Sequence, residues 1–563
     1  MIANLPPAAI LILGSLIVPL LRGRIKSIYL LALPLLSLLH LLGFNEGFYG
    51  EIVLFDYSLT MVRVDKLSLL FGYIFHIAAF VSVIYALHVK DNLQHVTGLA
   101  YVGSAIGAVF AGDLITLFVY WELTAVASVF LIWARRNRRA YAAGMRYLII
   151  QVGSGVLLLA GTLLHLHETG SIAFGYLGLN SLGTTLIFAA FGIKCAFPLL
   201  HNWLQDAYPE ATVTGTVFLS AFTTKLAIYT LARGFPGTEI LIPIGAVMTV
   251  FPIFYAVIEN DLRRVLAYSL NNQLGFMVAG IGVGTAMGIN GAVSHAFAHI
   301  LYKALLFMSM GAVLYRTGTI KASELGGLYK SMPFTTVCCL IGAASISAFP
   351  PLSGFVTKSM TLTAVAQGGF TISWFALLFA SAGVMHHSGI KIPFYGFFGR
   401  DSGIRYKEAP LNMRIAMGLT AALCVTIGVY RYPLYQILPH ATNFEPYTSS
   451  HVITQLQLLM FALLAFAILA RKHLETPEIP STNLDSDWIY RRFVPALLRS
   501  AVRAAEPVKN QVYRGGRVLV SSTIRQLQRH HDPQGLWGRT WLTGRSVLMV
   551  VIVLAVFLLF YYY

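Results

Sequence analysis

The chain has 563 residues, of which 57% are hydrophobic and only 11% are charged. Soluble domains carry about a quarter charged residues, so this chain has too little polar surface for a water-soluble globule of its size. A formal net charge of +17 would favour nucleic-acid binding in a soluble protein, but here the basic residues gather in short loops, and we expect no nucleic-acid partner. Because hydrocarbon offers no partner for an open strand edge, we predict an all-α polytopic membrane protein.

Sixteen apolar runs, separated by polar residues or by glycine and proline, predict membrane-spanning helices. A run of about 20 residues is long enough to cross roughly 30 Å of hydrocarbon. The first run is predicted to be a retained helix and not a signal peptide, because no basic residue precedes it and no small-residue cleavage site is obvious. The predicted spans are 6–21, 28–44, 66–87, 96–111, 113–134, 144–166, 184–208, 212–233, 241–258, 264–285, 287–315, 332–366, 371–398, 411–430, 452–470 and 545–563.

The loops after odd-numbered spans carry most of the basic residues. The loops on the opposite side are nearly free of them, with Arg63, Lys66, Arg233 and Arg431 as the main exceptions. The positive-inside rule therefore predicts an inner-membrane protein with the odd-numbered loops in the cytoplasm and both termini on the outer, periplasmic side. The basic residues of the first set are Arg22, Arg24, Lys26, Arg135, Arg136, Arg138, Arg139, Arg263, Arg264, Arg316, Lys321, Lys330, Arg400, Arg405 and Lys407.

Residues 486–530, between the last two spans, are too charged to cross a membrane. Their apolar residues recur at near-helical spacing beside arginines, which predicts an amphipathic lateral helix along the cytoplasmic face. We expect Pro507 and the Gly515–Gly516 pair to break this helix into pieces. It could serve as a surface anchor or as a strut that docks a partner.

The four cysteines lie in apolar stretches and show neither metal-ligand spacing nor a disulfide framework, so we interpret them as small buried thiols. Dinucleotide fingerprints, iron–sulfur cysteine sets and an evident haem motif are absent from the sequence. We therefore predict no cofactor and no redox machinery in this chain. The cysteines are Cys195, Cys338, Cys339 and Cys424.

Ionisable residues inside the spans are the candidates for function, because each costs about 2.5–3.5 kcal/mol near the bilayer centre. Any single one could snorkel to the interface or form a helix–helix hydrogen bond. For His386 and Lys391 in the thirteenth span, these simpler explanations are as good as a functional one. They fail for Glu122, Lys194, Lys225 and Lys303 together, because four separate helices would each carry a costly charge without reason. The main candidates are Glu122, Lys194, Lys225, His295, His299, Lys303 and Lys358.

His295, His299 and Lys303 are spaced four residues apart, so they stack along one helix face over about 12 Å. Two histidines at this spacing can bind zinc. No glutamate follows the first histidine and no third ligand is evident nearby, so we predict no metal site and favour a file of groups that gain and lose protons. Burial lowers the pKa of a lysine, and a nearby carboxylate raises it again. Glu122 and a lysine partner whose separation changes could therefore form a proton switch.

Prolines interrupt two of the lysine-bearing spans. Pro198 follows Lys194 by four residues, and the Pro350–Pro351 pair precedes Lys358 by seven. Proline removes a backbone hydrogen bond, so both spans are predicted to be broken helices. Paired broken helices indicate inverted repeats with a transport site between them, and spans 4–8 and 9–13 are the predicted repeats.

Five sequence blocks, in order over roughly residues 60–400, resemble the antiporter-like subunits shared by respiratory complex I and the Mrp-type multisubunit Na⁺/H⁺ antiporters. The stretch from Gly389 to Trp488 looks most like the D-type subunit of the Mrp antiporters. The blocks are Asp113–Glu122, Gly192–Ala207, Asp261–Gly275, His295–Phe307 and Leu325–Lys358.

The resemblance implies a role for each main candidate. Glu122 would be the family's fifth-helix glutamate, Lys194 its partner on the broken seventh helix and Lys225 the eighth-helix relay. The two histidines and the lysine of the eleventh span would be the central relay, and Lys358 the ionisable group on the broken twelfth helix. The accessory candidates are Asp113, His201, Asp206, His386 and Lys391.

The resemblance also implies a domain organisation. The lateral helix and final span look like the lateral arm of the largest complex I antiporter-like subunit, although 45 residues at about 1.5 Å each reach only about 65 Å, enough for one neighbouring subunit. The expected parts are N-terminal helices 1–95, proton half-channels 96–233 and 241–398, bundle helices 411–470, the lateral helix 486–530 and the terminal span 545–563.

The function implied by the resemblance is that of a proton-translocating subunit in a multisubunit monovalent cation/proton antiporter. Its partners would be other membrane subunits, including a further antiporter-like subunit, with protons and Na⁺ as candidate ions. One alternative is a proton-pumping subunit of a redox-driven complex, of the NADH–quinone oxidoreductase or membrane hydrogenase type, in which case the chain is a translocase subunit. Another is the membrane module of an inorganic-carbon uptake complex.

Overall fold

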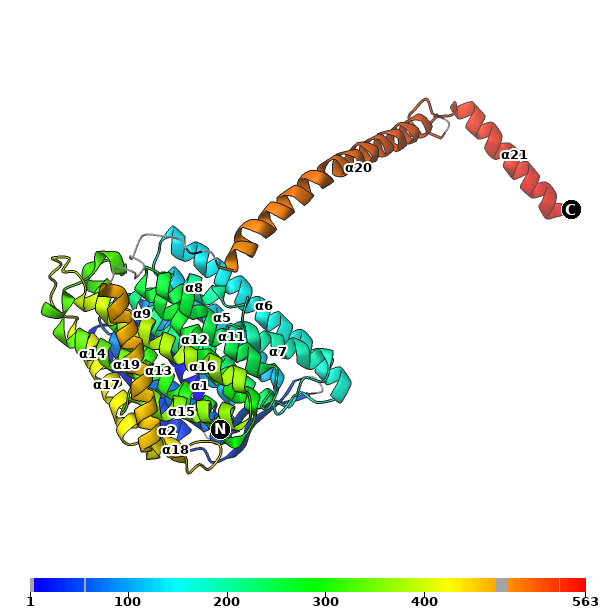
Figure 1. Ribbon diagram of the computed structural model, residues 1–563. Coiled ribbons are helices and arrows are strands. Elements are labelled where there is room, and N and C mark those ends of the chain that lie inside the picture. The colour runs from blue at the N-terminus through cyan, green and yellow to red at the C-terminus, as the bar shows by residue number, and fades with distance from the viewer. Residues whose placement is uncertain (1–4, 55–56, 472–482, 484, 536) are drawn as a thin grey trace. The chain divides into compact units, whose positions relative to one another are not determined.

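The computed structural model describes residues 5–54, 57–471, 483, 485–535 and 537–563. They form two compact units, Met1–Asn483 and Leu484–Tyr563. Figure 1 shows the first unit as a bundle of helices packed side by side. The prediction of a mostly helical polytopic membrane fold is confirmed, because eleven helices of the described residues are long and apolar enough to cross a membrane.

The elements of the first unit follow one another along the chain. The longer ones are α1 (Pro7–Ser15), α2 (Gly23–Leu41), β1 (Gly47–Leu54), β2 (Tyr57–Val64), α3 (Lys66–Ala86), α4 (Asn92–Phe110), α5 (Leu114–Trp133), α6 (Arg138–Thr169), α7 (Leu182–Lys194), α8 (Asn202–Ala207), α9 (Val213–Ala221), α10 (Thr223–Gly234), α11 (Leu241–Ile258), α12 (Leu262–Val283), α13 (Ala286–Thr317), α14 (Pro333–Ile346), α15 (Ser353–Gln367), α16 (Thr371–Val384), α17 (Leu411–Val429), α18 (Tyr432–Gln436) and α19 (Ser449–Arg471). Short 3₁₀ or π segments are η2 (Val18–Leu20), η3 (Tyr208–Glu210), η4 (Ala322–Glu324), η5 (Leu328–Lys330), η6 (Met385–Lys391) and η7 (Phe394–Phe398).

Each of the sixteen predicted spans overlaps a helix, and eleven of them coincide with the long apolar helices. The other five differ from a long apolar helix for visible reasons. The first is a short α1 continued by η2, the seventh and twelfth are broken, and the thirteenth continues from α16 into the π-helical η6. The tenth, α12, is long enough but carries a polar stretch at its middle, Asn271 to Gln273.

The β1–β2 hairpin was not predicted, so the expectation of an entirely α-helical fold is wrong in this segment. The two strands pair antiparallel, with Gly47 opposite Val64. The argument against strands applies only inside hydrocarbon, whereas this segment connects the second and third spans, where free strand edges can bond to water. The hairpin supports the functional region directly, because Thr60 of β2 donates its amide to the Asp113 carboxylate at 2.8 Å.

The breaks predicted from the prolines lie between α7 and α8 and between α14 and α15. In each break one alanine takes a left-handed conformation, Ala196 at φ 62° and Ala348 at φ 58°. Polar side chains satisfy the exposed carbonyls. Trp203 Nε1 donates to Ile193 O at 2.9 Å, and an amide from α19 donates to the carbonyl just after α14 at 3.2 Å. The four cysteines are free and buried, as predicted.

The second unit contains η8 (Ile489–Phe493), α20 (Val494–His531) and α21 (Thr543–Tyr562). The predicted breaks at Pro507 and at Gly515–Gly516 are wrong, because α20 continues through them for 38 residues, about 57 Å. A helix can absorb an internal proline by bending, and each glycine costs only about 1 kcal/mol relative to alanine. Figure 1 shows α20 as one continuous, curved helix.

Candidate functional site

Lys194 ends α7 inside the bundle, and its side chain is completely buried. Its ammonium donates to Trp121 O at 2.6 Å and to Thr124 Oγ1 at 2.7 Å, and it lies 4.2 Å from the Trp121 ring centroid. These partners are on α5, on either side of Glu122 in the sequence, and Glu122 interacts electrostatically with Lys194. The structure therefore brings together the first two residues predicted for the site.

Glu122 projects from α5 against the backbone of α6. Its Oε1 atom is buried and has no hydrogen-bond partner among the described residues. A Cβ atom at Gly155 would lie 1.4 Å from this oxygen, so only glycine leaves room for the carboxylate there. Trp121 Nε1 donates to Ser154 Oγ at 3.0 Å, which fixes α5 beside the same turn of α6.

Lys225 lies beside an interruption that the sequence did not predict. The eighth span divides at Phe222 into α9 and α10, which frees the carbonyl of Ser220 for another donor. Lys225 Nζ donates to this carbonyl at 2.5 Å and to Thr224 Oγ1 at 3.2 Å. Lys225 is fully buried and interacts electrostatically with Lys303 on α13.

The predicted central relay lies on α13, a helix that is enclosed almost completely by the bundle. His295, His299 and Lys303 are each fully buried. The ring centroids of the two histidines are 6.3 Å apart, and His299 interacts electrostatically with Lys303. Within the described part of the chain, neither His299 nor the Lys303 ammonium has a hydrogen-bond partner. These polar atoms are thus not held by bonds to neighbouring protein groups.

Two residues next to this relay were missed by the sequence analysis. His295 Nε2 lies 3.2 Å from Gln273 Oε1 on α12, and its Nδ1 lies 3.1 Å from Thr357 Oγ1 on α15. Thr357 directly precedes Lys358, so the histidine connects the central relay to the broken twelfth span. Gln273 lies inside the block Asp261–Gly275, and the run of three amide side chains from Asn271 to Gln273 inside a predicted span was a signal that could have identified it.

Lys358 repeats the arrangement of Lys194 in the second half of the bundle. It is buried on a broken helix, its ammonium lies 4.5 Å from the Phe276 ring centroid, and Nζ donates to Ser381 Oγ at 3.3 Å. Cation–π contacts of this kind stabilise an ammonium without a permanent counter-charge. The structure places His295 within electrostatic range of Lys358.

His387 is a further buried group that the sequence analysis missed, having named its neighbour His386. It lies in the π-helical η6 and is fully buried, whereas His386 is only partly buried, with its ring 5.5 Å from that of Phe466. His387 interacts electrostatically with Lys303 and Lys391. Adjacent residues on a helix point in different directions, so the sequence did not show which histidine faces inward.

The accessory candidates are engaged in structural contacts. Asp113 caps α5, accepting from Thr116 N at 2.7 Å. Asp206 accepts two bonds from Arg146 at 2.7 and 3.0 Å. Lys391 is buried and donates to two carbonyls at the end of α11 at 2.5 and 2.8 Å, which is a helix–helix hydrogen bond and not snorkelling. His201 lies buried in the break after α7.

Comparison with known proteins matches the region that carries these residues to one family. Residues 111–386 match the family described as NADH:quinone oxidoreductase/Mrp antiporter, transmembrane. This part of the chain belongs to that family. The matched region contains every main candidate residue of the site.

Relatives of two kinds are similar to the chain. Hydrogenase-4 component B of Escherichia coli (strain K12) is 28% identical over 541 residues, covering 85% of this chain and 80% of that protein. The D-type subunit of the Na⁺/H⁺ antiporter of Alkalihalophilus pseudofirmus is 29% identical over 357 residues, covering 59% of this chain and 71% of that protein. A chain of the Mrp complex from Dietzia sp. DQ12-45-1b shares the fold, with a TM-score of 0.68 at 20% identity over 78% of this chain and 96% of that chain.

The contact between Gly155 and Glu122 leads to a first prediction. Replacing Gly155 with alanine should displace the Glu122 carboxylate, because the new Cβ would occupy the position of Oε1. Infrared spectroscopy in the carboxyl region, with Glu122→Gln to assign the signal, should show a shifted Glu122 band. Gly153→Ala is the matched control, since it lies on the same helix and its Cβ would meet nothing within 4 Å. An unshifted band in Gly155→Ala would contradict the contact.

Proposed function

We propose that this chain is the proton-translocating subunit of a multisubunit monovalent cation/proton antiporter. The observation that carries the proposal is a series of buried ionisable groups that interact from one helix to the next. Lys225 lies close to Cys195, the residue after Lys194, and interacts electrostatically with Lys303. His387 in turn interacts with Lys303 and Lys391. The similarity to the D-type antiporter subunit supports the cation-coupled form of this function.

Glu122 acts in this proposal as the switch at one end of the series. When the carboxylate is ionised and close, it stabilises the ammonium of Lys194. When it is protonated or withdrawn, the ammonium keeps only neutral partners, the carbonyl of Trp121 and the hydroxyl of Thr124. A charged lysine is then less stable, and its proton passes towards Lys225.

Repulsion between neighbouring positive charges drives the proton onward. Protonation of one buried lysine raises the free energy of protonating the next, so neighbouring sites titrate as coupled groups. His299 and Lys303 suit this role because their nitrogen atoms make no hydrogen bonds among the described residues. The proton leaves near Lys358 or Lys391, on the second half of the bundle.

In this proposal the chain has sixteen spans in all. Two inverted repeats, 96–233 and 241–398, form the half-channels. The N-terminal helices 1–95 precede the repeats, and the bundle helices 411–470 follow them. The matching order of elements supports this arrangement. Asp113 caps α5 and Asp261 caps α12. The helix that follows each, α6 or α13, has 32 residues and ends at a left-handed glycine, Gly170 or Gly318. A broken helix then follows in both halves.

The odd-numbered loops face the cytoplasm in this proposal, and both termini face the periplasm. Contacts between these loops support their placement on one side. Arg136 pairs with Asp91 at 3.1 Å, joining the loops after the fifth and third spans. Lys330 pairs with Asp401 at 2.9 Å, joining the loops after the eleventh and thirteenth spans. The lateral helix would lie along the cytoplasmic face and, at about 57 Å, could reach one neighbouring subunit.

A redox-driven complex is the second candidate. The similarity to hydrogenase-4 component B favours it, because that alignment covers 85% of this chain. The two candidates share the same proton path and differ in what drives it. Purifying the native assembly and identifying its other subunits separates them: small multi-span subunits support the antiporter, whereas iron–sulfur or flavin subunits support the redox-driven complex.

Glu122→Gln and Lys194→Met should each abolish proton movement in everted vesicles, because each removes one member of the switch. The assembled complex is reconstituted in its membrane, and cation-driven or redox-driven proton uptake is measured with a pH-sensitive dye. Glu46→Gln and Lys407→Met, at exposed positions, are the matched controls and should keep full activity. If both switch variants insert normally and remain fully active, the relay assignment is wrong.

His387→Gln should reduce the same proton uptake about tenfold or more, on the scale of removing a proton-transfer group. The substitution keeps a polar side chain at the buried position but cannot carry a proton. His386→Gln serves as the neighbouring control, since that ring is only partly buried against Phe466, and its activity should stay within twofold of the unchanged protein. If the two substitutions changed proton uptake equally, His387 would not be part of the proton path.

A further inference from the structure

A basic pocket of about 490 Å³ lies outside the proton path, where α2 begins, α3 ends and α4 begins. We call it the α2–α4 pocket. Its polar lining comes mainly from Arg22, Lys26, Ser27, Lys90, Asn92 and His95, and the remainder is apolar. Neither the family match, which starts at residue 111, nor the relay includes any of these residues.

The pocket carries a surplus of positive charge. Lys26 is half-buried, and its ammonium donates to Asn92 Oδ1 at 2.7 Å, which holds it in the pocket. Asp91, the acidic group that interacts electrostatically with Lys26, is already paired with Arg136 at 3.1 Å and caps α4. Arg22 and Lys90 form no ion pair with any described residue. A negatively charged ligand would therefore meet three cations and one carboxylate that has a partner of its own.

The same end of the bundle is also built to face lipid. Leu21, Leu30 and Leu87 line the pocket beside the basic residues. On the outside of α2, Ile25 and Ile28 are 68% and 67% exposed, which suits contact with acyl chains and not with water. A ligand with a charged group and an apolar part matches this lining better than a purely ionic one.

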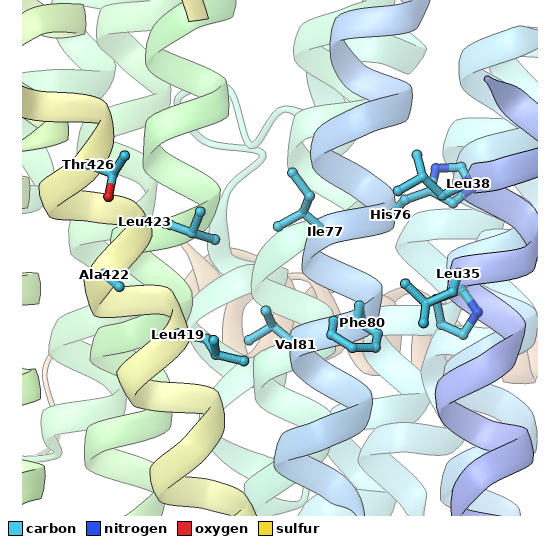
Figure 2. Close-up of a pocket in the computed structure, with 11 residues that line it drawn as sticks. Leu35, Leu38, His76, Ile77, Phe80, Val81, Leu419, Ala422, Leu423 and Thr426 are labelled. Atoms are coloured by element: carbon cyan, nitrogen blue, oxygen red, sulfur yellow. The ribbon is translucent and has the colours of Figure 1, made fainter. Parts of the chain in front are cut away.

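Further along the same helix pair, α2, α3 and α17 enclose an apolar pocket of about 330 Å³. Figure 2 shows Leu35 and Leu38 of α2 and Phe80 of α3 projecting into it, opposite Leu423 of α17. Lys26 and Leu38 are twelve residues apart, about 18 Å along a helix. With Lys26 at the level of the headgroups, this second pocket lies within the hydrocarbon.

We propose that the α2–α4 pocket binds the phosphate headgroup of an anionic phospholipid, whose acyl chains follow α2 and α3 into the membrane. Basic pockets between membrane helices recognise such headgroups through the negative charge of the phosphate. The site does not depend on the proposed proton path, because it shares no residue with it. With the cytoplasmic orientation proposed above, the lipid belongs to the inner leaflet.

The test measures lipid binding to the purified full-length chain in its assembly. Native mass spectrometry, with thermal unfolding as a second readout, is recorded with phosphatidylglycerol, with phosphatidylcholine and with inorganic phosphate. We expect phosphatidylglycerol to bind most tightly. Arg22→Ala and Lys26→Ala should each weaken its binding about fivefold, since one basic residue near an anionic headgroup contributes about 1 kcal/mol.

Arg24→Ala is the matched control, because Arg24 lies between the two tested residues in the sequence, is exposed and does not line the pocket. Its affinity for phosphatidylglycerol should stay within twofold of the unchanged protein. If Arg24→Ala weakened phosphatidylglycerol binding as much as the two pocket variants, general surface charge would explain the binding, and the proposal would be wrong. If phosphatidylcholine bound as tightly as phosphatidylglycerol, the pocket would not recognise negative charge. If inorganic phosphate stabilised the protein as much as phosphatidylglycerol, the ligand would not be a lipid.

Discussion

Burying lysine ammonium groups in a membrane-embedded bundle is the constraint on which the rest of the structure depends. A charged group in hydrocarbon is costly, so each such lysine must be enclosed by protein, and Lys194, Lys225 and Lys358 also have hydrogen-bond partners. The bundle does this by surrounding α9, α10 and α13 almost completely and leaving helices such as α19 to face outward. The helices that carry Lys225 and the central relay are therefore the least exposed of the long apolar helices.

An interrupted helix supplies a partner for one of these lysines. Inside a continuous helix the backbone carbonyls already accept backbone hydrogen bonds, so an interruption leaves a carbonyl open to an ammonium. The interruption at Phe222 frees the Ser220 carbonyl for Lys225. Lys194, at the end of α7, instead reaches a carbonyl and an aromatic ring on the continuous helix α5. The irregularity at Phe222, which would destabilise an ordinary helix, thus stabilises the charge of Lys225.

The helical bundle could largely be predicted from the sequence. The length of the apolar runs follows from the thickness of the bilayer, and the prolines mark where a helix is interrupted. The hairpin before α3 could not, since it lies where the membrane no longer restricts the backbone. The pairing of Glu122 with Lys194 was implied by family resemblance, whereas its dependence on Gly155 required coordinates. His387 escaped prediction because adjacent histidines on a helix point in different directions, and the sequence did not show which of the two faces inward.

Two kinds of buried cation in this bundle differ in their partners. Arg233 pairs with Asp65 at 2.8 Å, and although burial would raise the pKa of Asp65, hydrogen bonding and charge from Arg233, with Ser68 and Arg63, lower it to about 2. An arginine stays charged at all relevant pH values, so such a pair is permanent and structural. Lys225 and Lys303, in contrast, have no carboxylate partner among the described residues. A lysine without a carboxylate partner can lose its proton without leaving a buried anion behind, so Lys225 and Lys303 are better suited than Arg233 to carrying protons.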